Sequence, residues 1–456
     1  MINVSINMKL RKIKWNNHTV LGDLFLDFVN SQTNKPYDTI LLAGENGTGK
    51  STILDEISQI LNYGSHDGFD YIEYQIGDNI FKTSKLTDGS NYGNFFQISD
   101  ENNNIKQIRY DKSYSSELIN SDEQDLRRYG CVYSRARSDY KTQPIISTTI
   151  SELDKITHDV DVLDDFTSLK QLIVDVVNQD SSDYVETNIV LGNNPQPWDV
   201  FYPTSKLFRF KNAFDAFFDK MKYEKVADKD GEKSILFSKN GKSIPIDKLS
   251  TGEKQVVFRG IFLLRNTNAL DGAVIMIDEP ELSMHPKWEK KILSYYQSLF
   301  FKANQQTAQI IFATHSDHVL KEALANTTDN IVVTLVEKNG AIECRNIDAP
   351  TVLPSITSAE TNYFAFDVVS TDYHIELYGW LQDKENLNSV KRCDDFIKNH
   401  SNYDPLKHAK LSNHLTTTYE TLCTYIRNAI HHPDSGNKFT DSELRTSIEF
   451  LIDICK

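Results

Sequence analysis

The chain has 456 residues, with 49 Lys and Arg against 64 Asp and Glu, which gives a formal net charge of −15. This length accommodates two or three domains, and a 39% content of hydrophobic residues is typical of a globular protein rather than a disordered one. The acidic balance excludes a whole-molecule basic footprint for nucleic acid and leaves only a local basic groove possible.

The first part of the chain is predicted to form strands that lead into a phosphate-binding loop. Residues 8–15 and 21–28 alternate between apolar and polar side chains, as half-buried strands do. Residues 39–43 form a continuous apolar run, which is typical of a buried parallel strand. Residues 44–51 (GENGTGKS) follow at once and match GxxxxGK[ST], and residues 50–61 have the amphipathic pattern of a helix.

Each part of this motif has a chemical reason. Glycines let backbone N–H groups converge on phosphate oxygens, and the N-terminus of the following helix favours an anion. The Lys50 ammonium is expected to reach the terminal phosphates, and the Ser51 hydroxyl to bind Mg²⁺. The alternative is a plain strand–turn–helix corner, which would not need the complete motif. We therefore expect a nucleotide to be bound by Gly44, Glu45, Asn46, Gly47, Thr48, Gly49, Lys50, Ser51 and Thr52.

The next segments predict an antiparallel β subdomain and a helical insertion. Residues 65–145 carry short Tyr-, Phe- and Ile-rich stretches between Gly, Asn, Asp and Ser clusters, which indicates a small antiparallel meander. Residues 150–222 are expected to be helical, most clearly at 207–221, and residues 228–243 to form a hairpin.

A second candidate phosphate contact is the segment 249–255 (LSTGEKQ), which precedes a predicted helix. Ser250 is a favourable N-cap residue, and the open N–H groups of a helix start suit a phosphate. The alternative is that Ser250 only caps the helix and the segment contacts no phosphate. The nucleotide contacts expected here are Ser250, Thr251, Gly252 and Glu253.

Two further strands are predicted to deliver catalytic side chains. The apolar run 274–277 ends in Asp278 and Glu279, at the edge of a sheet where α/β proteins bind ligands. Asp278 is expected to hold Mg²⁺ through water, and Glu279 to act as the base that orients the attacking water. The alternative is a core strand that ends in two solvated acids. His315 follows the apolar run 308–314 and can hydrogen-bond a γ-phosphate, although a lone histidine is usually structural.

In this order, the four segments resemble the ATP-binding-cassette type of ATPase, in its SMC- and OLD-like branch. Residues 278–286 (DEPELSMHP) are similar to that branch's DEPE..LHP segment. The resemblance covers roughly residues 1–345 and implies the fold class α/β: a P-loop ATPase head with an antiparallel β subdomain and a helical insertion. It also implies ATP and Mg²⁺ as ligands. Two heads would dimerise head to tail, with ATP held between one phosphate loop and Ser250-Thr251-Gly252 of the other copy, so that ATP closes the dimer and hydrolysis opens it.

The chain departs from that pattern in three respects. Thr251 replaces the usual first glycine of the signature. The residues between the phosphate loop and the signature lack the long heptad coiled coil of SMC proteins, which predicts a compact relative. The glutamine of the family's glutamine loop is either Gln97 or Gln143. Before Gln143, Arg135 and Arg137 either face nucleotide or nucleic acid, or make ordinary salt bridges.

The C-terminal part is predicted to be a separate all-α domain. We expect an ATPase head at residues 1–348 and a helical domain at 359–456, with the boundary near the two prolines of 349–358. Apolar residues at spacings of three and four predict one long helix through Leu411, Leu415, Tyr419, Leu422, Ile426 and Ile430.

Residues 427–432 (RNAIHH) lie at the end of that helix and match RNxxxH, the motif of HEPN ribonucleases. The resemblance implies metal-free cleavage of RNA, with Arg427 stabilising phosphate charge, His432 as acid–base catalyst and Asn428 beside them. Two such sites would face each other in a dimer. On a regular helix His431 shares a face with Arg427, and His432 does not, but Pro433 takes His432 out of helical dihedrals. The alternative is a structural domain, in which His431 and His432 lie at a helix C-terminus that favours cations, and Arg427 pairs with Glu420 or another acid.

A compact head with such a tail resembles ATPases of bacterial anti-phage systems, including retron- and Septu-associated ATPases. We expect ATP hydrolysis that controls a nuclease output, through the chain's own HEPN-like site on an RNA substrate. The first alternative is an ATPase sensor that assembles with a separate effector nuclease. The second is a DNA-repair ATPase.

The cysteines and the apolar runs indicate in which compartment the protein is expected. The five cysteines are scattered and contain no CxxC, which excludes a disulfide framework or a zinc site. No apolar run approaches the ~20 residues that cross a bilayer, and the N-terminus lacks the apolar core of a signal peptide. We expect a cytoplasmic homodimer or higher oligomer without a membrane partner.

Overall fold

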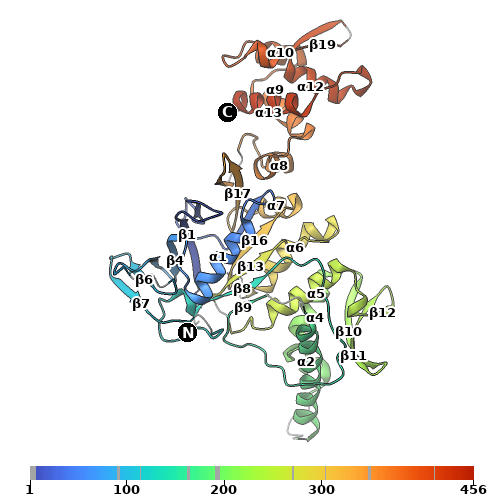
Figure 1. Cartoon of the computed structure of the whole chain (residues 1–456). Helices are drawn as coiled ribbons and strands as arrows, with labels where there is room; N and C mark the ends of the chain where they lie inside the picture. Colours follow the sequence, from blue (N-terminus) through green and yellow to red (C-terminus); the bar gives the residue numbers. More distant parts are fainter. Residues whose placement is uncertain are drawn as a thin grey trace.

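The computed structural model describes residues 7–89, 93–112, 115–161, 165–190, 196–269, 272–302, 305–347, 351–414 and 416–456 (Figure 1). Two of the predictions above, Leu415 and the end of the head at residue 348, fall outside these ranges. Within the ranges, no helix is both long and apolar enough to span a membrane.

The fold is built on a seven-stranded sheet with the strand order β18-β17-β3-β16-β13-β8-β9. All neighbours pair in parallel except β18, which is antiparallel to β17. Every residue of β3, β13 and β16 is buried, which explains their continuous apolar sequences. The strands are β3 (Thr39–Gly44), β8 (Cys131–Ser134), β9 (Asp159–Val160), β13 (Val274–Asp278), β16 (Gln309–Thr314), β17 (Asn330–Lys338) and β18 (Ala341–Ile347).

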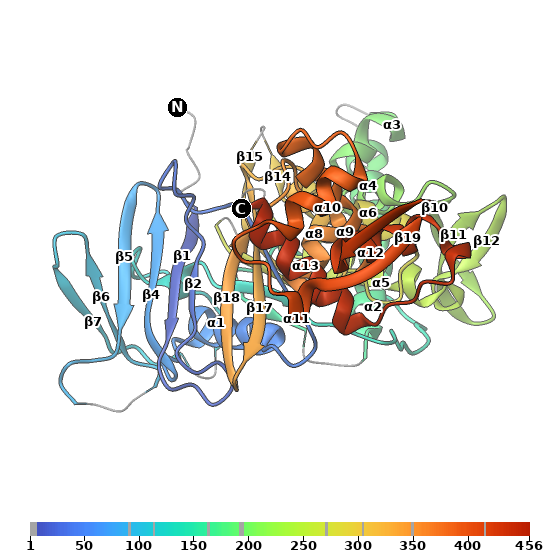
Figure 2. The same ribbon diagram turned by 90° about the horizontal axis from the view of Figure 1, so that it is seen from above.

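One face of this sheet is covered by α1 (Lys50–Tyr63) and a six-stranded antiparallel sheet, and all three share one hydrophobic core. The antiparallel sheet has the order β2-β1-β4-β5-β6-β7 and lies to one side in Figure 2. Its strands are β1 (Met8–Trp15), β2 (Phe25–Asp27), β4 (Phe69–Ile76), β5 (Asn79–Ser84), β6 (Phe96–Asp100) and β7 (Ile105–Ile108). The predicted meander is therefore confirmed for β4–β7, whereas Cys131–Ser134 joins the central sheet.

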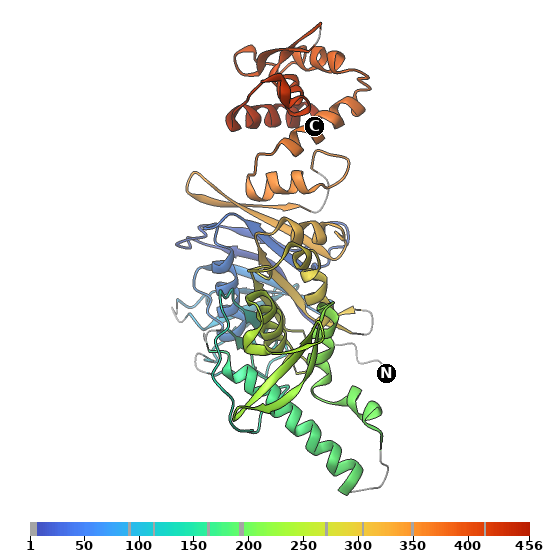
Figure 3. The same ribbon diagram turned by 90° about the vertical axis from the view of Figure 1, so that its right-hand side faces the viewer.

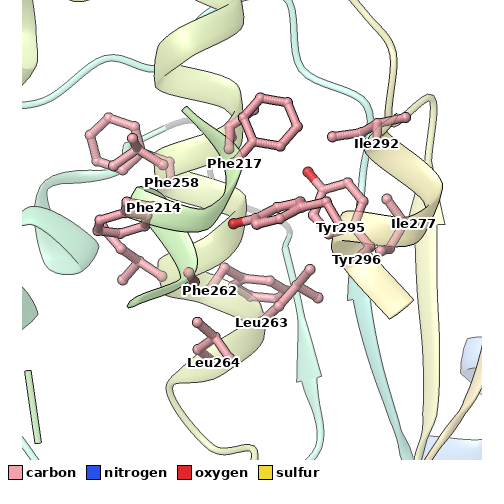
Figure 4. Packing of buried hydrophobic residues seen from close by; sticks show 14 of the residues in the cluster. Phe214, Phe217, Phe258, Phe262, Leu263, Leu264, Ile277, Ile292, Tyr295 and Tyr296 are labelled. Atoms are coloured by element: carbon pink, nitrogen blue, oxygen red, sulfur yellow. The ribbon is translucent and has the colours of Figure 1, made fainter. Parts of the chain in front are cut away.

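The other face is covered by helices and a three-stranded antiparallel sheet. Aromatic side chains of α4, α5 and α6 interlock over this face, with Phe214, Phe258 and Tyr296 among them (Figure 4). The elements are α2 (Thr167–Val185), α4 (Phe208–Phe217), α5 (Thr251–Leu264), α6 (Pro286–Leu299), α7 (Asp317–Leu324), β10 (Met221–Lys229), β11 (Glu232–Lys239) and β12 (Lys242–Pro245).

Two predicted segments differ in detail. The predicted helical region 150–222 contains α2, α4 and the short α3 (Trp198–Phe201), but the stretch before α2 is largely non-helical and contributes β9 to the central sheet. The predicted hairpin 228–243 becomes three strands, because a second left-handed turn at Asn240-Gly241 adds β12. The hairpin β17–β18 has its turn at Asn339-Gly340, as predicted. Strands β14 (Phe301–Lys302) and β15 (Gln305–Gln306) complete the head.

The C-terminal part has its own hydrophobic core and lies at the opposite end of the molecule from α2 (Figures 1 and 3). Helix α8 (Ser358–Phe366) joins the two parts: Ala365 packs in the head core, and Tyr363 packs in the C-terminal core. The remaining elements are α9 (Thr371–Lys384), α10 (Val390–Lys398), α11 (Pro405–His408), β19 (Ala409–His414), β20 (Thr417–Thr421), α12 (Leu422–His431) and α13 (Asp441–Cys455).

The prediction of one long helix from residue 411 to 430 is wrong in its first half. Strands β19 and β20 pair as an antiparallel hairpin, and the helix α12 begins only at Leu422. Leu411 is 70% exposed, so its spacing from the later apolar residues does not reflect a shared buried face. The C-terminal domain is therefore helical with an added hairpin.

Candidate functional site

The phosphate loop leaves the buried strand β3 and enters α1, as the motif predicts. Gly47 and Gly49 have φ of 89° and 83°, a left-handed conformation that glycine adopts without strain. At Gly44 a Cβ atom would lie 2.4 Å from the carbonyl oxygen of Leu335 on β17. The loop is therefore packed against a neighbouring strand, and its glycines are required by conformation and by close approach.

Lys50 is folded back over this loop. Its Nζ donates hydrogen bonds of 2.8 Å to the carbonyl oxygens of Gly44 and Glu45, and the Thr48 hydroxyl also donates to Glu45 O. Burial lowers the pKa of Lys50 to about 8, although the carboxylates around it, Asp278 first, oppose this shift. The ammonium group therefore lies among the carbonyl groups of the loop, from where its side chain can rotate to contact a bound anion.

Ser51 and Asp278 join the loop to the end of β13. The Ser51 hydroxyl donates a 2.9 Å hydrogen bond to Asp278 Oδ2, and burial raises the pKa of Asp278. Asp278 Oδ1 is buried and has no hydrogen-bond partner. The described residues contain no cluster of three or more His, Cys, Asp or Glu that would hold a metal by itself. One hydroxyl and one carboxylate with a spare oxygen fit Mg²⁺, which keeps waters and phosphate oxygens as its other ligands.

Glu279 and His315 face each other at the carboxyl ends of β13 and β16. Glu279 Oε1 lies 3.3 Å from His315 Nε2, and this hydrogen bond lowers the pKa of Glu279. The neighbouring Glu281 accepts hydrogen bonds from His315 N and the Thr314 hydroxyl, which fix the segment after β16. Glu279 is therefore held ionised beside the acid–serine pair, in the protonation state that a base needs.

The predicted signature residues lie at the start of α5. Ser250 and Glu253 form a capping box, in which each side chain accepts a hydrogen bond from the other residue's backbone N–H. At Gly252 a Cβ atom would lie 2.7 Å from Ser283 O, in the loop that follows Glu279. A pocket of about 790 Å³ opens here, between this helix start and Trp288. No hydrogen bond among the described residues joins this segment to the phosphate loop of the same chain.

Sequence reasoning missed two buried polar side chains that contact the acid-bearing turn. Gln255 Nε2 donates to the carbonyl oxygens of Glu279 and Pro280, and Arg259 Nη2 donates to that of Asp278. Both residues lie on α5, four residues apart. The signal in the sequence is that Gln255 directly precedes, and Arg259 interrupts, the otherwise apolar stretch 256–264 of the helix.

The other polar candidates have structural partners. Arg135 forms a salt bridge with Asp55 on α1, and Arg137 forms one with Asp161. These ion pairs agree with the alternative that the two arginines make ordinary salt bridges. Gln97 is buried in β6 of the antiparallel sheet, whereas Gln143 is exposed and its backbone N–H bonds Thr167. The glutamine loop remains a prediction for either residue.

In the C-terminal domain, Arg427 and Asn428 of the RNxxxH motif lie on α12 (Leu422–His431), and His432 directly follows this helix. Arg427 Nη1 donates a 3.1 Å hydrogen bond to Asn428 Oδ1, and Asn428 Nδ2 is buried without a partner. His432 has left the helix, with φ −130° and ψ 71°, as expected from Pro433. Glu420 pairs with Lys398, and no ion pair between Glu420 and Arg427 occurs in the described residues. Arg427 and Asn428 thus contact each other on α12, His432 follows directly after this helix, and all three lie in the C-terminal domain; their joint role as a site stays a prediction.

Three comparisons place these features among known proteins. A family model described as "AAA domain, putative AbiEii toxin, Type IV TA system" matches residues 40–321, which span the phosphate loop, the signature and both acids. The chain is 25% identical over 370 residues to "Retron Vc95 probable ATPase" of Vibrio cholerae, covering 65% of this chain and 68% of that protein. It is 28% identical over 198 residues to "Retron Ec83 probable ATPase" of Escherichia coli, covering 41% of this chain and 32% of that protein.

Among solved structures, the chain is similar to the SMC head domain from Thermotoga maritima, with a TM-score of 0.38 and 11% identity, over 74% of this chain and 99% of that one. A second is an SMC head bound to the C-terminal winged-helix domain of ScpA, with a TM-score of 0.42 and 13% identity, over 74% of this chain and 98% of that one.

Proposed function

This chain belongs to the family of ATPases described as "AAA domain, putative AbiEii toxin, Type IV TA system", and we propose that its ATP cycle controls a nuclease output in anti-phage defence. The observation that carries the ATPase part of this proposal is the Ser51–Asp278 hydrogen bond with Glu279 and His315 beside it, at the edge of the sheet where the phosphate loop lies. The retron names of the two relatives support the assignment to defence.

The nucleotide steps are assigned to residues of the head. Lys50 exchanges its two carbonyl partners for β- and γ-phosphate oxygens, and the loop N–H groups hold the phosphates. Ser51 and Asp278 are the residues that would hold Mg²⁺, and the ion would supply positive charge for the transfer of the phosphoryl group. Glu279 orients the attacking water and accepts its proton, and His315 holds Glu279 in place.

The signature segment is assigned to the nucleotide of a second copy. In the part of the chain that the structure describes, no hydrogen bond joins Ser250, Thr251 or Gly252 to the phosphate loop, and a pocket lies beside them. The start of this helix, at the positive end of its dipole, suits a γ-phosphate presented by another head. ATP would thus close a head-to-tail dimer, and hydrolysis by Glu279 would open it.

The output is assigned to the C-terminal domain. The hydrogen bond from Arg427 to Asn428 holds the guanidinium near the end of α12, and His432 follows a few residues later. In the described residues Arg427 has no ion pair with Glu420, so its charge is available for a phosphate. Dimerised heads would bring a second copy of the motif. In the alternative, the tail only assembles oligomers, and a separate effector nuclease acts under control of the head.

RNA integrity in cells that express the chain alone tests the two readings. Wild type should cleave RNA and leave 2′,3′-cyclic phosphate ends, and the variant Arg427→Ala/His432→Ala should not, with its oligomeric state unchanged. Lys50→Ala should abolish the control by ATP. Lys384→Ala, on the same domain, is a matched control that should cleave like wild type. Cleavage that persists in the double variant would contradict an intrinsic nuclease, and intact RNA in every strain would favour the separate effector.

A further inference from the structure

Helix α5 carries two buried polar side chains that the roles assigned above do not use. Gln255 and Arg259 are 0% and 1% exposed, and they lie four residues apart, so they share one face of the helix. Arg259 forms no salt bridge within the described parts of the chain, although a buried guanidinium is costly without a carboxylate partner. A role in packing alone would be served as well by apolar side chains.

Both side chains donate hydrogen bonds to main-chain carbonyl groups at the end of β13 and in the turn that follows it. Gln255 Nε2 lies 3.3 Å from Glu279 O and 3.0 Å from Pro280 O. Arg259 Nη2 lies 2.7 Å from Asp278 O. Three consecutive carbonyl groups, which begin at the metal-binding acid and include the base, are therefore tied to one helix.

The same guanidinium also fixes the neighbouring strand end. Arg259 Nη2 donates to Arg135 O, just after β8, and Nε donates to the Tyr140 hydroxyl. Tyr140 in turn stacks on Phe258 of α5. A planar fork that reaches three acceptors from one position is specific to arginine, and the single ammonium of lysine does not reproduce it.

The turn itself needs this support. Glu279 has φ of 45°, in the left-handed region that non-glycine residues avoid, and such a conformation persists only where surrounding contacts hold it. Its N–H donates to Ala313 O at 2.8 Å, and its carbonyl accepts from Gln255. The direction of the Glu279 carboxylate is therefore set through its main chain.

From this geometry we infer that Gln255 and Arg259 are positioning residues, which hold Asp278 and Glu279 in their reactive arrangement through the main chain. The inference rests on the proposed function, in which Glu279 is the base. Because α5 begins directly after Ser250 and Gly252 abuts Ser283 in the same loop, one rigid helix links the signature to the acid-bearing turn. Engagement of the signature by a second copy therefore reaches Glu279 through these two side chains.

The test is steady-state ATP hydrolysis together with ATP affinity for Gln255→Leu and Arg259→Lys. The turnover number should fall by about tenfold or more, while the Kd for ATP stays within about twofold, because the phosphate loop is untouched. Gln309→Leu is the matched control. Gln309 is also a fully buried glutamine, but its side chain bonds the backbone of Leu10 and Tyr37 at the other end of the sheet. This control should lose thermal stability and keep its turnover number.

Wild-type turnover in Gln255→Leu overturns the inference, even if Arg259→Lys fails to fold. An equal fall of turnover in Gln309→Leu overturns it as well, because the effect would then reflect general destabilisation. Glu279→Gln is measured in parallel. If that variant keeps wild-type turnover, the assignment of Glu279 as the base is wrong, and the inference is wrong with it. If it loses turnover while both α5 variants keep theirs, the inference alone is wrong.

Discussion

At the scale of single residues, the nucleotide site depends on close approach of backbone as much as on charged side chains. Gly44 lies against Leu335 O, and Gly252 lies against Ser283 O, each too close for a Cβ atom. The motif predicted these glycines as phosphate contacts. Their packing was not predictable, because it depends on partners 291 and 31 residues further along the chain. The pairing of β17 with β3 brings Leu335 to Gly44, and the tertiary fold brings the loop of Ser283 to the start of α5.

Gly252→Ala tests this packing. A Cβ atom 2.7 Å from Ser283 O forces the loop after Glu279 to move, so we expect ATP turnover to fall by about tenfold or more and the free energy of unfolding to drop by about 1–3 kcal/mol. Gly379→Ala in α9 is the control, since its added Cβ meets no atom within 4 Å and alanine favours a helix by about 0.5–1 kcal/mol. Chemical unfolding and hydrolysis assays measure both. A Gly252→Ala variant with normal turnover would contradict the tight packing.

Residue types in the site were predictable, but their partners were not. The sequence motifs identified Ser51, Asp278, Glu279 and His315 one by one, and the structure shows that they contact one another in pairs. Gln255 and Arg259 were missed, because their position beside an apolar stretch of helix does not by itself tell a buried donor from a solvated one. Burial of a polar face is a property of the tertiary fold.

At the scale of elements, continuous apolar strands were predicted most reliably. Strands β3, β13 and β16 are buried on both faces, so their sequences carry no competing polar pattern. The hairpin β19–β20 was predicted as helix, because apolar residues at spacings of three and four happened to precede α12. The β-branched run of Thr416, Thr417 and Thr418 was the opposing signal.

The start of α12 depends on one buried carboxylate. Asp394 of α10 accepts hydrogen bonds from Glu420 N, Thr421 N and the Thr421 hydroxyl, and it is fully buried. Asp394→Ala should therefore lower the free energy of unfolding of the C-terminal domain by about 3 kcal/mol, because three donors lose their acceptor. ATP turnover by the head should stay unchanged, since the domain has its own core. Asp395→Ala, exposed on the same helix, is the control. Unchanged stability of Asp394→Ala would contradict this account of the helix start.

At the scale of the whole molecule, two separate cores are joined through α8. Tyr363 and Ala365 on this helix face the C-terminal core and the head core, and Arg345 of β18 lies over the ring of Phe364. A change in the arrangement of two heads would therefore be carried to the C-terminal domains by a packed element. The sequence predicted a boundary near residues 349–358 from its prolines, but not that a helix beside it belongs to both cores.

The proposed dimer is testable by mass. With ATP and Mg²⁺, Glu279→Gln should form a stable dimer, because ATP is bound and not hydrolysed. The variant Ser250→Arg/Glu279→Gln should remain monomeric, since the added side chain fills the signature surface. Size-exclusion chromatography with light scattering gives both masses. A dimer that forms without nucleotide, or equally in both variants, would contradict closure through the signature segment.

The most direct test of the whole account is the rate of ATP hydrolysis by Glu279→Gln beside its affinity for ATP. The account predicts that ATP binds as tightly as to wild type, while turnover falls by at least about a hundredfold, because the water loses its base. Lys50→Ala should differ by losing ATP binding itself. Hydrolysis by Glu279→Gln at the wild-type rate would contradict the assignment of the base, and with it the proposed control of the output by ATP.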